Sequence, residues 1–154
     1  MTRLAIAISL SVAIFGCSDE SVCDVEELAQ RDVEGVDPVV DCGDYSVGAG
    51  TDYPELVAAR DCVLDALAEE SSFRVTWRYS SFEGPISKAY VGTGLGEDAP
   101  HIAQYTRANS VGEPVTSQLT CDDLIPLGEC NARLQQGSLC LDCAAPQQKT
   151  LCEE

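Results

Sequence analysis

The pattern of hydrophobic and polar positions is clearest in residues 51–82, where a helical period gives way to a strand period. Leu56, Val63 and Leu67 fall on one stripe of a helix, with polar residues on the opposite side. Ser71 and the serine after it interrupt this period. The pattern therefore predicts one long helix, which begins within the first residues of this stretch and ends before Ser71.

A second pattern follows, in which apolar and polar residues alternate as they do in strands that bury one face. Residues 73–79 alternate most strictly, and three later segments, 86–93, 101–107 and 115–121, are also predicted as strands. Turn residues separate the four strands, so we expect them in hairpin succession. One helix followed by such strands predicts an α+β fold, with the helix packed on a four-stranded antiparallel meander. This outline resembles cystatin-like folds, and the resemblance concerns the fold alone.

The rest of the chain carries little periodicity, and this divides the sequence into four parts. We interpret residues 1–16 as a signal peptide. Residues 17–50 are interpreted as an acidic tether and N-terminal segment, in which residues 26–31 fit a short helix. Residues 51–121 form the predicted helix-on-sheet domain. Residues 122–154 are predicted to be a disulfide-rich, irregular C-terminal tail that wraps the domain.

An apolar run from Leu4 to Phe15 follows a single basic residue, as in an export signal. A helix over this run spans only about 18 Å, which is too short for a hydrocarbon core of about 30 Å. The residues Ile14-Phe15-Gly16-Cys17 resemble the lipobox of bacterial lipoproteins. The resemblance implies cleavage before Cys17, lipidation of that cysteine, and anchoring in the bacterial cell envelope. Ser18, rather than Asp, implies transport to the outer membrane; plain secretion with cleavage nearby is the alternative.

The composition is strongly acidic, because 26 acidic and 9 basic residues give a formal net charge of −17. This balance argues against nucleic acid as a partner, since phosphate contacts need a basic patch. It also implies that contact with a membrane comes from the acyl chains of the anchor. Most of the acidic excess lies in residues 17–70, which we interpret as a solvated tether and a solvated helix face.

The chain contains nine cysteines, and an even number remains once Cys17 is assigned to lipid. In an oxidising compartment such a set predicts a disulfide framework. Cys62 lies on a flank of the predicted helix, so a segment packed along that flank should supply its partner. Cys42 is the first candidate and Cys121 is its rival. The predicted disulfide cysteines are Cys23, Cys42, Cys62, Cys121, Cys130, Cys140, Cys143 and Cys152.

Two features suggest chemistry, and each has a simpler structural interpretation. Cys140 and Cys143 have the spacing of a redox pair, but no helix N-terminus is predicted beside them. Zinc would need further ligands, such as Cys130 or His101, and exported thiols more often pair with one another. His101 is the only histidine, and no nucleophile motif surrounds the serines near it. The sequence therefore predicts no catalytic residue, no metal site and no cofactor.

One surface remains as a candidate binding site. If the large residues of the segment 73–79 face the helix, Arg74 and Arg78 face the open side of the sheet. We expect Lys88 and Tyr90 to share that side. Tyrosine and arginine are enriched at binding hot spots, so this face suits an acidic partner. An ordinary solvated sheet face is the alternative.

These observations predict a small, disulfide-stabilised envelope lipoprotein with a non-enzymatic binding or structural role. Its expected partners are the membrane, through the lipid anchor, and an unknown protein, such as an envelope enzyme that it inhibits. The alternative is a hydrolytic enzyme of the cell envelope that uses acidic residues. A deep cleft holding two carboxylates with raised pKa values would favour the enzyme, and a convex body without a pocket would favour the interaction module.

Overall fold

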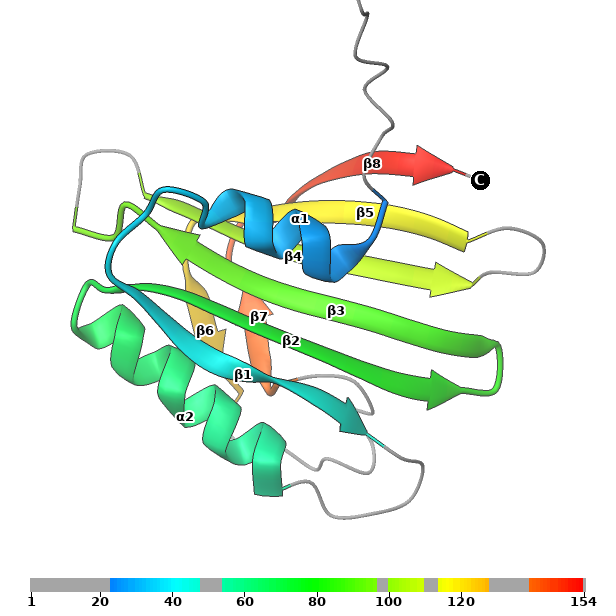
Figure 1. Ribbon diagram of the computed structural model, residues 1–154, viewed down its shortest axis with the longest axis horizontal. Coiled ribbons are helices and arrows are strands. Elements are labelled where there is room, and N and C mark those ends of the chain that lie inside the picture. The colour runs from blue at the N-terminus through cyan, green and yellow to red at the C-terminus, as the bar shows by residue number, and fades with distance from the viewer. Residues whose placement is uncertain (1–22, 48–53, 97–99, 110–113, 128–138, 154) are drawn as a thin grey trace, which may run out of the picture.

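The computed structural model describes residues 23–47, 54–96, 100–109, 114–127 and 139–153. Two helices and eight strands lie in these residues, arranged as a sheet with a helix on each side (Figure 1). Within the described ranges, neither helix is long and apolar enough to cross a membrane. In chain order the elements are α1 (Val25–Asp32), β1 (Val39–Val47), α2 (Pro54–Ala68), β2 (Ser72–Ser81), β3 (Gly84–Thr93), β4 (His101–Asn109), β5 (Pro114–Cys121), β6 (Leu124–Pro126), β7 (Leu141–Cys143) and β8 (Gln147–Glu153).

Six strands form one mixed sheet, in the order β1-β2-β3-β4-β5-β8. β1 runs parallel to β2, and every other neighbouring pair in this sheet is antiparallel. β6 and β7 form a separate two-stranded sheet. The two helices pack on opposite faces of the large sheet, with α1 over β3 and its neighbours and α2 along β1 and β2 (Figure 1).

The face that α2 covers carries the largest apolar side chains, and we call it the α2 face. Phe73, Val75 and Trp77 alternate along β2, are fully buried, and belong to the same core cluster as the apolar side of α2. The rings of Trp77 and Tyr90 lie 5.4 Å apart, centre to centre. Burial of each large apolar side chain contributes about 1.5–3 kcal/mol. Helix α2 and strand β2 lie where the hydrophobic pattern predicts a helix and the first strand.

The face that α1 covers carries small side chains, and we call it the α1 face. Ala89 and Val91 of β3 and Ala103 of β4 are fully buried there. They cluster with Leu28 and the other apolar residues of α1. Asp24 caps this helix, because its carboxylate accepts hydrogen bonds from two first-turn backbone N–H groups.

The architecture predicted from the sequence, one helix on a four-stranded antiparallel meander with a cystatin-like outline, is wrong. Strands occur at all four predicted places, as β2, β3, β4 and β5, but they form the middle of a larger mixed sheet. β1 adds in parallel at one edge and β8 adds in antiparallel at the other. A second helix, α1, covers the face that was expected to be open.

The first group of missed elements lies in residues 17–50, which were predicted to be largely a tether. The short helix expected at residues 26–31 does form, as α1, but it is part of the core, and β1 follows it. β1 lacks a clear strand pattern because Asp41, Gly43 and Asp44 are poor strand formers. Its register against β2 shifts between Asp41 and Asp44, which marks a bulge there.

The second group of missed elements lies in residues 122–154, which were predicted to be an irregular tail. β8 forms an edge of the main sheet although its sequence, QQKTLCE, does not alternate between apolar and polar residues. β6 and β7 contain three residues each, too few for a period of two to be recognised. The tail is therefore built into both sheets.

Disulfides fasten these elements to one another. Cys42 of β1 pairs with Cys62 of α2, and their Cα atoms lie 5.7 Å apart. The predicted partner of Cys62 is thus confirmed. Its rival, Cys121, at the end of β5, pairs with Cys143 of β7.

The chain is also fastened from one end to the other. Cys23, just before α1, pairs with Cys152 of β8, at a sequence separation of 129 residues. Cys140 is disulfide-bonded as well. Every cysteine in the described part of the chain is therefore bonded, as the disulfide framework predicted from the sequence requires.

Candidate functional site

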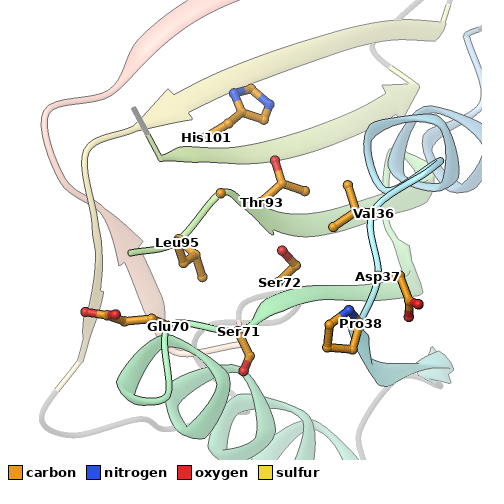
Figure 2. A pocket seen from close by; sticks show the side chains of 10 residues that line it. Val36, Asp37, Pro38, Glu70, Ser71, Ser72, Thr93, Leu95 and His101 are labelled. Carbon is orange, nitrogen blue, oxygen red and sulfur yellow. The ribbon is translucent and has the colours of Figure 1, made fainter. Parts of the chain in front are cut away.

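A groove of about 490 Å³ lies at the end of the sheet where α1 finishes (Figure 2). Its walls come from three connections that are far apart in the sequence. Val36, Asp37 and Pro38 come from the connection between α1 and β1. The other two walls are the segment 70–71, between α2 and β2, and the segment 94–95, which follows β3.

The floor of the groove is a row of polar side chains on three neighbouring strands (Figure 2). Thr93 of β3 stands opposite His101 of β4, and Ser72 of β2 follows on the other side of Thr93. Neighbouring strands lie about 4.8 Å apart, so Thr93 separates Ser72 from the imidazole of His101. The floor thus offers hydroxyl groups and one imidazole to the groove.

Glu70 is placed at the groove by the way in which α2 ends. The N–H of Glu70 donates to the carbonyl of Leu67, and the N–H of Ser71 donates to that of Ala66, as in a Schellman motif. The φ of Glu70 is 55°, a conformation that costs a non-glycine residue about 1–2 kcal/mol. A Cβ atom at Gly96 would lie 2.7 Å from a carboxylate oxygen of Glu70, so the glycine leaves room for this carboxylate.

The imidazole of His101 belongs to a hydrogen-bonded network that joins the groove to α1. Its Nε2 lies 3.4 Å from Oδ2 of Asp32, the last residue of that helix. The same carboxylate oxygen accepts a hydrogen bond of 2.5 Å from the hydroxyl of Tyr105. Gln118 Nε2 donates to that hydroxyl at 2.9 Å. The network holds the imidazole at the edge of the groove.

The pKa values of Asp32 and His101 shift in opposite directions. The hydrogen bond to Asp32 raises the pKa of His101 above its usual value; burial opposes this effect and the charge of the carboxylate supports it. Burial acts to raise the pKa of Asp32, but the hydrogen bonds from His101 and Tyr105 outweigh it and lower that pKa. Asp32 is therefore stabilised as a carboxylate, and His101 gains a preference for the protonated form.

Two further carboxylates, of Asp37 and Glu70, line the groove, and both residues are exposed. Within the described residues, neither carboxylate makes an ion pair or a side-chain hydrogen bond. They leave the groove with an uncompensated negative charge. Val36, Pro38 and Leu95 add apolar contact area. This arrangement suits a small polar ligand that carries a positive charge.

Arg74 and Arg78, predicted to lie on an open binding face, lie beside α1. Arg74 donates to the carboxylate of Asp41 at 2.9 Å and also to the side chain of Gln30. Arg78 pairs with Glu26 of α1 at 2.5 Å. Both guanidinium groups remain partly exposed, but their charges are already paired with groups of the chain itself.

Lys88 and Tyr90, predicted to share that face, lie on the opposite one. In the register of β2 and β3, Lys88 stands opposite Trp77 and Tyr90 stands opposite Val75, so both belong to the α2 face. Tyr90 is buried, and its hydroxyl donates to the carbonyl of Leu141 at 3.1 Å. The predicted four-residue surface is not formed, because a shift of one residue moves every side chain of a strand to the other face.

The spacing of Cys140 and Cys143 does not mark a redox pair, because Cys143 is bonded to Cys121. Among the residues that the structure describes, no group of three or more His, Cys, Asp or Glu side chains is arranged to hold a metal ion. The predicted lipidation site Cys17 and the predicted disulfide cysteine Cys130 lie outside the described residues.

The sequence singles out only one residue of this groove, His101, and only because it is the sole histidine. Asp32, its partner in the network, is 69 residues away along the chain. The end of α2 is also unusual, because a glutamate rather than a glycine occupies the left-handed position, but only the structure shows this.

Comparison of the chain with protein-family models, with curated proteins and with solved structures found no match. In its described residues the chain forms a disulfide-fastened mixed-sheet domain with a helix on each face and an open polar groove at one end.

Proposed function

We propose that this chain is a lipid-anchored protein of the bacterial envelope whose domain binds a small, positively charged polar ligand. The observation that carries the binding role is the groove, which is lined by Asp37 and Glu70, whose carboxylates are unpaired among the described residues, and by His101, which is paired with Asp32. The lipobox-like residues 14–17 support the anchor.

The disulfides support export of the domain. Bonded cysteines are characteristic of oxidising compartments, and every cysteine in the described ranges is bonded. The first of them, Cys23, follows the proposed lipidation site Cys17 by a few residues, so the anchor holds the domain near the membrane.

The electrostatics of the groove support binding rather than acid–base hydrolysis. A hydrolytic pair of carboxylates needs one member that stays protonated at the working pH. Asp32 is instead favoured as a carboxylate, since its pKa is lowered. The hydroxyl of Ser72 is also separated from His101 by Thr93, so the floor does not form a serine–histidine pair. Binding a cationic ligand through hydrogen bonds to carboxylates requires neither a protonated carboxyl group nor a serine–histidine pair.

The lipid anchor is tested by Cys17→Ser. The substitution should block removal of the signal and release the protein from the membrane fraction, because the thiol that carries the lipid is absent. Ser18→Ala is the control and should leave fractionation unchanged. Fractionation and intact mass report the outcome, and an unchanged mass and membrane location of Cys17→Ser would contradict the anchor.

The groove is tested by calorimetric titration of the purified protein with spermidine, a small flexible polycation, and with triethylene glycol, which is uncharged. Spermidine should bind and the glycol should not. Glu70→Gln should weaken spermidine binding by about threefold to tenfold, the size of one solvent-exposed charge contact. Glu69→Gln, at an exposed neighbour that does not line the groove, is the matched control. Equal affinities for both variants would contradict the proposed site.

A further inference from the structure

We propose that the turn between β2 and β3 makes a second contact with the membrane, in the lipid headgroup region, through Phe82. This contact points the groove away from the bilayer. The inference rests on the proposed lipid anchor and adds to it an orientation of the domain and a protein surface that touches lipid.

Phe82 is the most exposed large apolar side chain among the described residues, with a relative exposure of 110%. It lies in the turn between Ser81 and Gly84, the last paired residues of β2 and β3. The hydroxyl of Ser81 accepts a hydrogen bond from the N–H of Glu83 and donates one to the carbonyl of Gly84. The turn is thus held by its own hydrogen bonds while the aromatic ring remains in solvent.

The turn projects beyond the strands on either side of it (Figure 1). β1 pairs with β2 only as far as Tyr79, and β4 pairs with β3 only from Ile86 onward. Within the described residues, segment 80–85 is therefore a two-stranded tip that extends past its neighbours. Phe82 stands at the end of this tip, where it can contact a flat surface before the described residues of β1 and β4 do.

The chain enters the domain toward this same end of the sheet. The carbonyl oxygen of Cys23 accepts hydrogen bonds from Arg107 of β4 and Thr116 of β5. Arg107 stands opposite Ser87 of β3. From Ser87 to Phe82 the strand advances by about 16 Å, at about 3.3 Å per residue.

The tether has the length that a shared membrane contact requires. Cys17 lies close before Cys23, and an extended chain between them reaches at most about 20 Å. This reach matches the distance of about 16 Å along the strand to the tip. An acyl chain on Cys17 and the ring of Phe82 can therefore meet the same bilayer surface.

The groove lies at the other end of the same strands. Thr93, at the end of β3, and His101, at the start of β4, form part of its floor, whereas the turn precedes β3. A strand of this length spans about 30 Å. With the turn at the lipid surface, the groove opens toward the aqueous side, where it is accessible to ligand.

The charge of the tip favours a lipid surface over a charged protein partner. The chain has a formal net charge of −17, yet residues 79–86 contain a single charged side chain, that of Glu83. Glu83 directly follows Phe82, so the ring enters the headgroup region with one carboxylate beside it rather than with a cluster of carboxylates.

The experiment uses the lipidated protein in vesicles of phosphatidylethanolamine and phosphatidylglycerol with brominated acyl chains, which quench tryptophan by contact. Phe82→Trp places a reporter in the turn. Ile125→Trp is the matched control, because Ile125 is also exposed but follows Cys121, which pairs with β4 at the groove end. Trp77, the only native tryptophan, is fully buried and supplies a constant background.

Brominated vesicles should quench Phe82→Trp severalfold more than Ile125→Trp, and the unsubstituted protein should show little quenching. Equal quenching of both reporters on vesicle-bound protein would overturn the inference and leave the lipid anchor standing. Failure of the unsubstituted protein to sediment with vesicles would overturn the anchor and this inference together.

Discussion

The two faces of the main sheet hold their helices by different means. On the α2 face, large side chains such as Phe73 and Trp77 fill the space between sheet and helix. On the α1 face, the sheet presents small side chains such as Ala89 and Ala103, and α1 packs on them. Ion pairs such as that of Arg78 lie at the rim of this second contact.

This difference shows what kind of burial a hydrophobic pattern can reveal. Large apolar side chains at a period of two identify a buried face directly. A face covered by a short acidic helix carries alanines in its centre and arginines at its rim, and this composition also fits a surface in water. The α1 face was therefore interpreted as solvent-exposed, although a helix covers it.

One disulfide fastens each helix, and removing each bridge measures how the two attachments differ. The Cys23–Cys152 bridge joins the residue just before α1 to β8, at a sequence separation of 129 residues. The Cys42–Cys62 bridge joins β1 to α2 at a separation of 20. In the chain-entropy model these bridges contribute roughly 5 and roughly 3 kcal/mol. Paired Cys→Ala variants should lose free energy of unfolding in that order, measured by urea titration. A larger loss at Cys42–Cys62 would contradict the loop-length account.

The sequence predicts the α2 face well because its residues obey one period. It fails on β3, where Ala89 and Val91 are buried against α1 while Tyr90 is buried against Trp77. A strand covered on both faces loses its alternation. Tyrosine has an apolar ring and a polar hydroxyl, so its position in a pattern fits either a buried or an exposed site. The ring of Tyr90 is buried, and its hydroxyl donates a hydrogen bond to a backbone carbonyl. For this reason the sequence-based prediction assigned Lys88 and Tyr90 of β3 to the wrong face of the sheet.

The groove could not be predicted, because its residues meet only through the order of the strands. Asp37 reaches the end of α2 because β1 adds to β2 in parallel, and no local pattern specifies a parallel neighbour. Asp32 reaches His101 because α1 crosses the sheet and ends above β4. Only the single histidine, His101, carries a local signal in the sequence.

Charge reversal at Arg74 and Arg78 should destabilise the packing of α1 on the sheet and leave the packing of α2 unchanged. Arg74→Glu with Arg78→Glu places like charges beside the acidic partners of both residues. Exposed pairs contribute about 0.2–1 kcal/mol each, and the repulsion that replaces them is of similar size, so we expect a loss of about 1–2 kcal/mol in urea unfolding. Arg60→Glu is the control, since the ion pair of Arg60 lies within α2 itself. Unchanged stability of the double variant would mean that apolar contacts alone hold α1.

The smallest expected effect is a pH dependence that belongs to the α1 face. The pKa of His101 is raised in the folded protein, so its stabilisation is fully present below the unfolded value of about 6.5 and is lost as the pH rises through the folded value. The pKa of Asp32 is lowered, so its contribution is present above about pH 3.9 and is lost as the pH falls through the folded value. Both contributions are therefore present between about pH 4 and 6.5.

His101→Gln separates this titration from the rest of the molecule, because the chain contains no other histidine. The free energy of unfolding of the unsubstituted protein should decline between about pH 6 and 8, and the curve of the variant should be flatter. The imidazole is 41% exposed, so solvent screening keeps the difference below about 1 kcal/mol. Tyr105→Phe is the control: it removes a hydrogen bond to Asp32 but keeps the histidine, and the pH slope should remain. Parallel curves for His101→Gln and the unsubstituted protein would show that the pair contributes nothing to the attachment of α1.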